Sequence, residues 1–451
     1  MSTADDVLIV QVGQCGVTAG AALSARICAR HDACMAQPAS RRPRAPLDGL
    51  LVRRGRADTP SSPAAADELV PRAVSVDAEP KAMHDAHKAH TKPVAAVWTE
   101  GGRGGVFANG FARDYGGGGA RGLPQQASSA RRGGESGVNL LSAAMAAVRA
   151  WAESSATTPD VLLLHSLAGG TGSGLGTRLL ETMRDDGFHK AFVVTASVVP
   201  LACGESPIQA VNATLSLSSL AENADAALLL RNDDAVRAAT RAREPGMQGA
   251  NAYLAALLER TLAAHGRGVA PLRDIVTECA PIPAMKFLDA HTSWRPASQP
   301  SSSLSSTPPW REVLKAHLAP LVCRTHVDGT TPIKSISSMA FAHGTESDAG
   351  EALATLQASR TYTHAAWQTD PWRTRSRPLP LLAGEARHLT VISNRSNAID
   401  VLEGSARRTR ALLRAGAFVH HYTPFGVDKE DWEHACHVAE TTSDAYRAFY
   451  L

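Results

Sequence analysis

The chain has 451 residues, of which 44% are hydrophobic and 20% charged, and its formal net charge is +3. This composition is typical of a globular protein with two or three full-sized cores, and the near-neutral charge gives no electrostatic signature of nucleic-acid binding. No apolar run reaches the roughly 18 residues of a membrane span. Seven cysteines without paired C-x-x-C spacing indicate reduced thiols. We therefore expect a cytoplasmic protein with neither a nucleic-acid nor a membrane partner.

The chain opens on a strand–turn–helix unit. Residues 7–12 are an apolar run broken only by Gln11, and residues 13–16 form a glycine-containing turn before an Ala-rich helix over 17–30. From 36 to 66 the composition shifts to Pro, Arg, Ser and Ala, which predicts a flexible insertion. Its arginines favour a solvated loop over a binding patch.

The next predicted strand, over residues 73–80, ends in Asp77, Glu79 and a proline. Carboxylates at the carboxyl end of a strand lie where open α/β sheets bind ligands, and hard cations such as Mg²⁺ prefer oxygen ligands. His84, His87 and His90 follow at intervals of three. A solvated helix or loop explains these histidines, and metal binding is the alternative.

A glycine- and arginine-rich stretch over 101–137 predicts a ligand-facing loop around 112–116 followed by an insertion. After it, apolar residues recur at helical spacing over 140–151, which predicts a core-facing helix.

The stretch 165–177 carries the strongest chemical signal, since it has five glycines in the eight residues from 169 to 176. It follows a buried-strand pattern at 161–164 and leads into a helix at Arg178. The first amides of a helix lack internal partners and can bind a phosphate, which glycines allow to come close. The stretch fits neither GxxxxGK[ST] nor GxGxxG after a strand. A tight turn that binds nothing is the alternative.

Further strands are predicted at 190–200 and 226–230, so strands alternating with helices favour a parallel, doubly wound sheet in the first 250 residues. A long apolar helix over 247–264 then leads to a second unit. That unit contains a Pro/Ser-rich loop at 293–309 and a strand at 389–393. The end, 396–451, is helical with a turn at 422–426, and Asp428 is predicted to cap the last helix.

Five segments, taken in this order, resemble the tubulin family: residues 12–16, 77–80, 169–174, 393–399 and 417–422. The resemblance covers nearly the whole chain outside its insertions. Within the family the chain is most similar to the delta-tubulin branch. The features that carry this are Ala168 in place of a first glycine, residues 203–205 before Gln209, and residues 420–426.

The resemblance implies an α/β fold made of a doubly wound parallel-sheet GTPase domain, a connecting core helix, a smaller α/β domain and a C-terminal helical pair. The corresponding boundaries are 1–245 for the nucleotide-binding domain with its insertions at about 36–66 and 101–137, 246–265 for the connecting helix, 266–394 for the intermediate domain with its loop insertion at about 293–309, and 395–451 for the C-terminal helices.

The function implied is that of a GTP-binding cytoskeletal protein that acts in the assembly or maintenance of centriole and basal-body triplet microtubules. Its expected cofactors are GTP or GDP and Mg²⁺. Its expected partners are other tubulins in head-to-tail contact and centriole or basal-body components. The expected location is the cytoskeleton at the base of a cilium or flagellum.

The resemblance also assigns site residues. The phosphates would lie against Gln14, Cys15 and the glycine stretch, Mg²⁺ would be held through water by Glu79 with Asp77, and Asn251 would bond the guanine base. Either Asn232 or Asp233 would contact ribose or base. The full expected nucleotide set is Gly13, Gln14, Cys15, Asp77, Glu79, Ser166, Ala168, Gly169, Gly170, Thr171, Gly172, Ser173, Asn232, Asp233 and Asn251.

Several positions depart from the family pattern. Thr18 stands where the family has glutamine, and Met247 replaces an aromatic residue that stacks on guanine. Arg113 could pair with the γ-phosphate. Asp274 falls at the acid that orients water in the next subunit's site, and Glu278 is a competing candidate for that catalytic role.

These departures leave two functional hypotheses open. In the first, GTP hydrolysis is weak or depends on assembly, because a neighbour supplies the water-positioning acid. In the second, the protein is a non-hydrolysing, nucleotide-locked structural component in a complex with other minor tubulins. A prokaryote-type division GTPase and a dinucleotide-dependent dehydrogenase fit the motifs less well.

Overall fold

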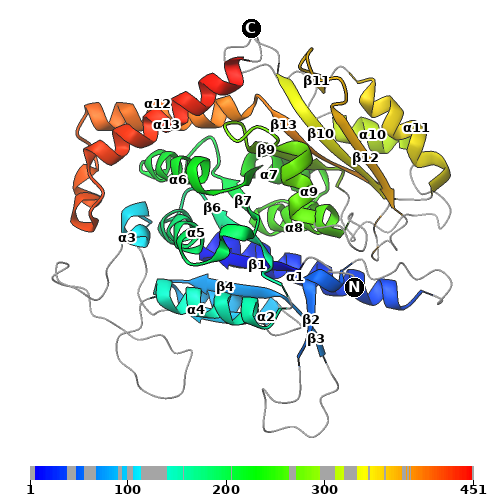
Figure 1. The fold of residues 1–451 in the computed structure, drawn as a ribbon, viewed down its shortest axis with the longest axis horizontal. Helices are drawn as coiled ribbons and strands as arrows, with labels where there is room; N and C mark the ends of the chain where they lie inside the picture. Colours follow the sequence, from blue (N-terminus) through cyan, green and yellow to red (C-terminus); the bar gives the residue numbers. More distant parts are fainter. Residues whose placement is uncertain are drawn as a thin grey trace, which may run out of the picture.

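The structure of the protein is a computed structural model, drawn in Figure 1. It describes residues 6–37, 47–54, 68–89, 94–98, 105–112, 140–155, 157–204, 206–263, 271–294, 310–318, 333–343, 346–359, 362–377, 382, 385 and 387–448. Within these ranges no helix is long and apolar enough to cross a membrane.

Eleven strands of the described chain form one sheet, in the order β11-β10-β13-β9-β8-β7-β6-β1-β4-β5, with β12 paired to β10. Their bounds are β1 Val7–Val12, β4 Ala73–Asp77, β5 Ala95–Trp98, β6 Asp160–Ser166, β7 Val193–Val199, β8 Ala226–Arg231, β9 Phe287–Thr292, β10 Lys334–His343, β11 Thr363–His364, β12 Trp372–Arg377 and β13 His388–Arg395. All neighbouring pairs from β5 to β9 are parallel, whereas β13 is antiparallel to both β9 and β10. The parallel α/β fold expected from the sequence is confirmed.

Strand order reverses at β1. The chain runs from β1 outward to β4 and β5, and then returns to β6 on the other side of β1 before continuing to β7 and β8. In an open α/β sheet, ligands bind at the carboxyl ends of the strands beside such a reversal. The loops that follow β1 and β6 therefore meet at the place where a ligand site is expected.

Helices cover both faces of this half of the sheet, and its strands are therefore buried on both sides. Side chains of β1 alternate, so that Ile9 packs toward α1 (Gly13–Met35) and α8 (Met247–Ala263), and Val10 packs toward α4 (Leu140–Glu153), α5 (Gly176–Asp185) and α6 (Gln209–Asn223). Each fully buried Val, Leu or Ile contributes roughly 1.5–3 kcal/mol relative to exposure. The long helix α8 is buried along most of its length, as its apolar sequence predicts.

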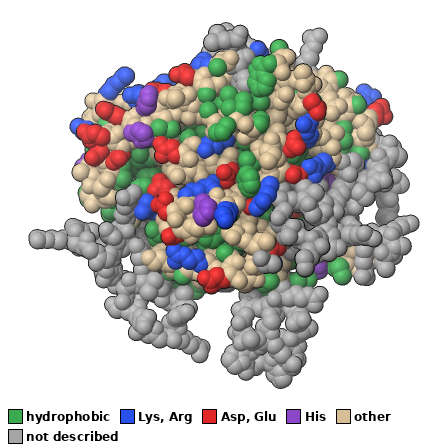
Figure 2. Space-filling model, viewed as in Figure 1, with side chains coloured by type: hydrophobic (Ala, Val, Ile, Leu, Met, Phe, Trp, Pro, Cys, Tyr) green, Lys and Arg blue, Asp and Glu red, His purple; other side chains and the backbone are tan. Residues whose placement is uncertain are grey.

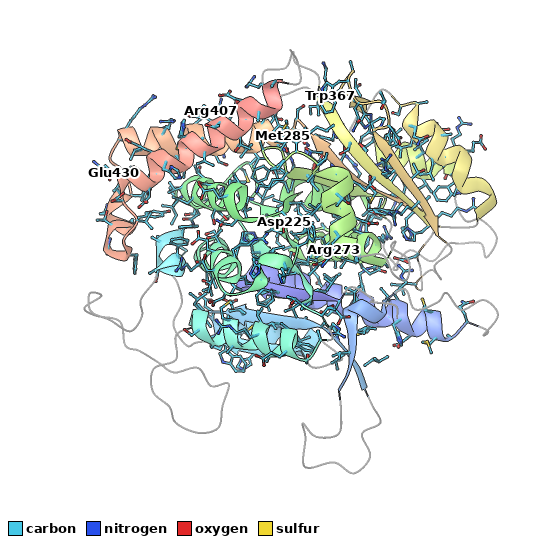
Figure 3. The ribbon with its side chains drawn as sticks, viewed as in Figure 1. Asp225, Arg273, Met285, Trp367, Arg407 and Glu430 are labelled. Atoms are coloured by element: carbon cyan, nitrogen blue, oxygen red, sulfur yellow. The ribbon has the colours of Figure 1, made fainter. Side chains whose placement is uncertain are left out.

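The other half of the sheet carries the remaining helices. α10 (Trp310–Leu318) and α11 (Glu346–Gln357) pack on β10 and β13. α12 (Ala398–Arg414) and α13 (Lys429–Arg447) form a hairpin that lies against α6, on the side of the molecule away from α10 and α11 (Figures 1 and 3). The Asp428 carboxylate accepts the Asp431 amide at 3.2 Å, so the predicted cap of the last helix is confirmed. Acidic side chains gather on the surface where α13 begins (Figure 2).

Three features differ from the expectations. The two predicted α/β units share one continuous sheet, because β9 pairs in parallel with β8. Within the predicted insertion at 36–66, strand β2 (Leu51–Arg54) pairs with β3 (Glu68–Pro71), and within 101–137 a short helix α3 spans Phe107–Phe111. The helix α1 begins at Gly13, so the expected glycine turn is its first turn. Within these three predicted insertions, residues 38–46, 55–66, 101–104, 113–137 and 295–309 lie outside the described residues.

Candidate functional site

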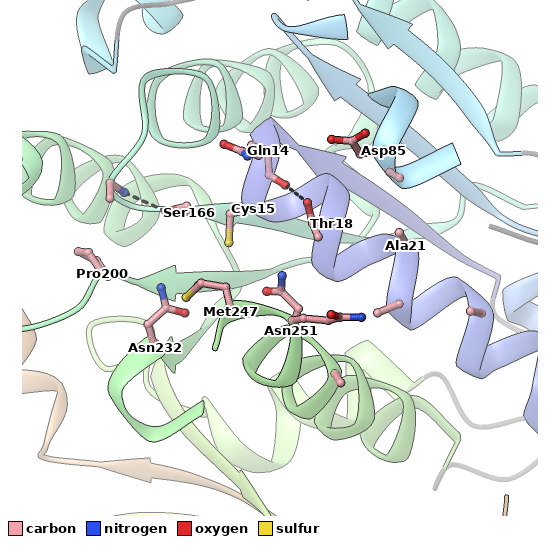
Figure 4. A pocket seen from close by; sticks show the side chains of 16 residues that line it. Gln14, Cys15, Thr18, Ala21, Asp85, Ser166, Pro200, Asn232, Met247 and Asn251 are labelled. Carbon is pink, nitrogen blue, oxygen red and sulfur yellow. Dashed lines mark hydrogen bonds between the residues drawn. The ribbon is translucent and has the colours of Figure 1, made fainter. Parts of the chain in front are cut away.

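A cavity of about 690 Å³ lies between α1, α8 and the loops that follow β6, β7 and β8 (Figure 4). Its lining residues are Gln14, Cys15, Thr18, Ala21, Ala22, Ala25, Asp85, Ala86, Ser166, Ala168, Pro200, Asn232, Met247, Gln248, Asn251 and Ala252. Six of the predicted nucleotide residues are in this set: Gln14, Cys15, Ser166, Ala168, Asn232 and Asn251. The volume is in the range of small-molecule and cofactor sites.

The glycine stretch lies beside the end of the cavity that Ser166 and Ala168 line, but Gly13 and residues 169–173 are not among the lining residues. Residues Gly170–Leu175 make a π-helical turn that continues directly into α5, so the first amides of a long helical segment face outward. Gly13 has φ +74°, and a side chain there would come within 2.7 Å of the Gly172 nitrogen. The two loops at the strand reversal therefore touch through their backbones, which only glycine permits.

Gly169 has more open space around its Cα than the neighbouring glycines have. A Cβ atom built on Gly169 meets no described atom within 4 Å, although the residue has ordinary backbone angles. By contrast, a Cβ on Gly110 would lie 2.2 Å from the Gly170 carbonyl oxygen. Gly170 is thus fixed against α3, and Gly169 leaves open space at the rim of the loop.

His165, near the end of β6, forms a hydrogen bond to the backbone of the glycine turn. Its Nδ1 lies 2.9 Å from the Gly172 carbonyl oxygen and its Nε2 lies 2.8 Å from Ser197 Oγ. A carbonyl only accepts hydrogen bonds, so Nδ1 carries the proton and Nε2 accepts from the hydroxyl. Burial lowers the pKa of His165 to about 4, despite the bond to Gly172. The imidazole is therefore neutral at physiological pH and acts as a fixed support for the turn.

The opposite end of the cavity carries amide side chains. Asn232, the first residue of α7 (Asn232–Arg241), is 8% exposed, and its Oδ1 has no hydrogen-bond partner among the described residues. Asp233 does not line the cavity, because its carboxylate accepts the Ala202 amide at 3.0 Å. Of the two residues that the sequence left as alternatives, Asn232 is the one with an unused polar atom at the cavity. Met247 and Asn251 come from α8, and Figure 4 draws Met247 between Asn232 and Asn251.

Asp77 is the last residue of β4, the neighbour of β1 in the sheet, and Glu79 follows two residues later; neither of them lines the cavity. Asp77 is 2% exposed; its Oδ1 accepts the Ala78 amide at 2.7 Å, whereas its Oδ2 has no hydrogen-bond partner in the part of the chain that the structure describes. Burial raises the pKa of Asp77 to about 6, against the effect of the Ala78 and Glu79 amides. An unpartnered carboxylate oxygen fits a hard cation that takes few protein ligands and keeps several waters.

The two candidate catalytic acids lie on α9 (Pro271–Cys279) and are not among the cavity residues. Each is paired with an arginine of β12: Asp274 with Arg375, and Glu278 with Arg373 at 2.7 Å. Burial raises the pKa of Asp274 above its usual value, although Arg375 lowers it in part. Within one chain, therefore, these acids do not reach the cavity.

Several cavity residues carry no chemical signature in the sequence. Asp85, Gln248 and three alanines of α1 enter the lining only because α2 (Pro80–Ala89), α1 and α8 come together around it. Thr18, which departs from the pattern of the similar family, donates its hydroxyl to the Gln14 carbonyl at 2.7 Å. Arg113 lies outside the described residues.

Comparison with known proteins agrees with this geometry. Residues 125–240 match the family model described as the Tubulin/FtsZ family, GTPase domain. The chain is 24% identical to a tubulin beta chain of Encephalitozoon cuniculi over 387 residues, covering 82% of each chain. It is 24% identical to a tubulin beta chain of Encephalitozoon intestinalis, covering 95% of this chain and 93% of that one, and 22% identical to a tubulin beta-1 chain of Anemia phyllitidis, covering 95% and 92%.

Proposed function

We propose that the chain binds GTP or GDP in the cavity between α1, α8 and the glycine turn. The premise is that it carries a GTPase domain of the tubulin/FtsZ family. The observation that carries the proposal is the pair of loops at the strand reversal, which touch through Gly13 and Gly172 and leave open space over Gly169. Outward-facing amides at a helix start favour a negatively charged group. The phosphates therefore belong at this end.

The base belongs at the other end. The Oδ1 of Asn232, which has no hydrogen-bond partner among the described residues, and the amide of Asn251 provide both donors and acceptors, as the mixed edge of guanine requires. Met247 is 44% exposed and provides a flexible apolar surface in place of an aromatic ring. We expect weaker stacking on the base than an aromatic side chain would give.

Asp77 and Glu79 are the residues that would hold Mg²⁺, through water or directly. The cation would neutralise phosphate charge when bound. The Oδ2 of Asp77, which no described residue bonds, supports that assignment, because a buried carboxylate oxygen without a partner is costly unless a cation or proton compensates it.

For hydrolysis we propose assembly dependence, with Asp274 of one molecule acting in the site of the next. The absence of α9 residues from the lining of the cavity, as the described chain forms it, supports this view. The alternative is a nucleotide-locked structural protein that does not hydrolyse GTP. The pairing of Asp274 with Arg375 favours this alternative, because it engages the carboxylate that would orient water.

We further propose that the chain is of the delta-tubulin type and acts with other tubulins at centrioles or basal bodies. The support is in the sequence: Ala168 at the start of the glycine stretch, residues 203–205, and residues 420–426. Localisation of the tagged full chain in ciliated cells tests this proposal, and a uniform cytoplasmic distribution would contradict it.

The nucleotide proposal is tested with a matched pair of glycine variants. Gly169→Ala places a methyl group in open space at the rim of the turn, and Gly404→Ala does the same on α12, where a Cβ also meets no described atom within 4 Å. Binding of N-methylanthraniloyl-GDP with Mg²⁺ is measured for the wild type and both variants. We expect about a tenfold loss of affinity for Gly169→Ala, from lost amide–phosphate bonds, and no loss for Gly404→Ala.

Thermal unfolding of both glycine variants provides the control for folding. Gly404→Ala is expected to stabilise α12 by about 0.5–1 kcal/mol, as alanine does in a helix interior. Absence of nucleotide uptake by well-folded wild-type protein would overturn the proposed function.

A further inference from the structure

Asn212, on the first turn of α6, contacts three distant parts of the chain through one side chain. Its Nδ2 donates to the Ala168 carbonyl at 2.6 Å and to the Gly105 carbonyl at 2.7 Å. Its Oδ1 accepts the Phe107 amide at 2.9 Å and the Tyr422 hydroxyl at 2.6 Å. The residue is fully buried. Two donors and two acceptor positions are all that an asparagine side chain offers, so all of them are used.

The four partners also define the orientation of the amide. Both contacts on Nδ2 are carbonyl oxygens, which only accept, and the backbone amide on Oδ1 only donates. A flipped amide would oppose each of these contacts. The arrangement therefore holds the Ala168 carbonyl, at the start of the glycine turn, in one direction.

Tyr422 comes from the turn between α12 and α13. Its ring is fully buried and packs edge-to-face on Trp432, with ring centroids 4.9 Å apart. Burial raises the pKa of Tyr422, so its hydroxyl stays protonated and donates to Asn212. The turn reaches this position through Phe418, which has a positive φ of +64°. The C-terminal hairpin is thereby connected to the glycine turn through one buried amide.

We propose that Asn212 is a positioning residue of the nucleotide site, through which Tyr422 of the C-terminal hairpin orders the start of the glycine turn. This inference rests on the proposed function for its ligand, a guanine nucleotide, but its geometry is independent of it. Turning the Ala168 carbonyl toward Asn212 leaves amide groups, and not a carbonyl oxygen, to face the phosphates. A change in the hairpin is thus transmitted to the site.

The test uses two buried tyrosines of the same C-terminal region. Tyr422→Phe removes the hydroxyl that orients Asn212 and retains the ring. Tyr446→Phe is the matched control, since the Tyr446 hydroxyl is equally buried but bonds Phe287 and Asn394 in the sheet. We expect N-methylanthraniloyl-GDP to dissociate about threefold to tenfold faster from Tyr422→Phe, as for the loss of one buried hydrogen bond, and at the wild-type rate from Tyr446→Phe.

Amide hydrogen exchange of residues 166–176 is measured in parallel on nucleotide-free protein. Faster exchange there in Tyr422→Phe, without the same change in Tyr446→Phe, is the expected result. Unchanged exchange overturns the inference. Failure of the wild type to bind nucleotide would overturn the proposed function instead, and the two failures are therefore distinguishable.

Asn212→Asp tests the donor side of the amide separately from its acceptor side. The carboxylate retains the acceptors for Phe107 and Tyr422 but opposes the carbonyls of Ala168 and Gly105 when ionised. A protonated carboxyl group can donate to one of them. We expect a larger loss of nucleotide affinity at pH 8 than at pH 6 relative to wild type. A loss that is equal at both pH values would indicate a general packing defect and contradict the positioning role.

Discussion

Asp274 on α9 is ion-paired with Arg375 on β12, a strand that follows about a hundred residues later in the chain. Both side chains are partly exposed, at 24% for Asp274 and 32% for Arg375, so the pair contributes little to stability. Its consequence is chemical. The carboxylate that the proposed mechanism offers to a neighbouring molecule's nucleotide is already engaged within its own chain.

Replacing Arg375 by alanine is expected to remove the ion pair of Asp274 with β12 and to raise assembly-dependent GTP hydrolysis. We expect about a twofold to fivefold increase, corresponding to the loss of one partly exposed ion pair. Phosphate release is measured at concentrations where the protein self-associates or binds other tubulins. Arg373→Ala, which frees Glu278 instead, is the matched control.

The acid itself is tested by Asp274→Asn, in which hydrolysis is expected to fall to background and Arg375→Ala to have no further effect. If neither Arg375→Ala nor the wild type releases phosphate in assemblies, the nucleotide-locked alternative is supported.

A second prediction concerns the two neighbouring residues at the start of α7. Asn232→Ala is expected to weaken GDP binding about tenfold, because a buried polar contact to the nucleotide is lost. Asp233→Ala is expected to change the affinity less than about twofold, since Asp233 bonds the Ala202 amide and does not line the cavity. Fluorescence titration of both variants checks the order. A larger loss in Asp233→Ala would show that the ribose or base lies against the other residue.

The third prediction is a pH dependence caused by Asp77. Its pKa in the folded protein is about 6, above its ordinary value of 3.8, so the folded state binds the proton more tightly than the unfolded state. The contribution of Asp77 to stability without Mg²⁺ is therefore fully present below about pH 4 and is lost as the pH rises through 6, by on the order of 3 kcal/mol. Urea unfolding between pH 4 and 8 measures this decline.

Asp77→Asn is expected to flatten that profile between pH 4 and 7, because the amide has no proton to release. Mg²⁺ should restore the stability of the wild type at pH 7 and have little effect on the variant, since cation and proton compete for the same oxygen. A wild-type profile that is already flat over this range would remove the basis for the magnesium assignment.

The fourth prediction concerns a buried charge network around Glu385. Its carboxylate accepts from Arg30 at 2.8 Å, from Arg260 at 3.1 Å and from Arg26. These arginines come from α1 and α8, so Glu385 attaches the segment before β13 to the nucleotide-binding half. Burial would raise the pKa of Glu385, but Arg260, Arg30 and Arg26 together lower it below its usual range. Its contribution is present above about pH 4.5 and is lost as the pH falls below that value.

Glu385→Gln is expected to destabilise the protein by about 3 kcal/mol or more, because three arginines lose a buried counter-charge. Glu440→Gln, which breaks a partly exposed pair with Arg410, is expected to cost less than about 1 kcal/mol. Urea unfolding at pH 7 compares the two. Equal effects would mean that solvent reaches the Glu385 network and screens it.

Much of the local structure could be predicted because it depends on short spacings. The glycine stretch after a buried strand predicted a turn that leads into a helix, the apolar spacing over 247–264 predicted the long helix, and Asp428 predicted the start of α13. Helix periodicity, capping and glycine conformations are properties of a few adjacent residues.

The relationships that decide the site join residues far apart in the sequence. Asn212 and Tyr422 are 210 residues apart, and Glu385 and Arg30 are 355 apart. The choice between Asn232 and Asp233, and the pairing of Asp274 with Arg375, likewise depend on where helices and strands pack. Spacing along the chain carries no information on such pairs, because strand register and helix packing determine which buried groups meet. The sequence by itself determined the strand, turn and helix around the glycine stretch; the tertiary structure alone decided which side chains support that turn.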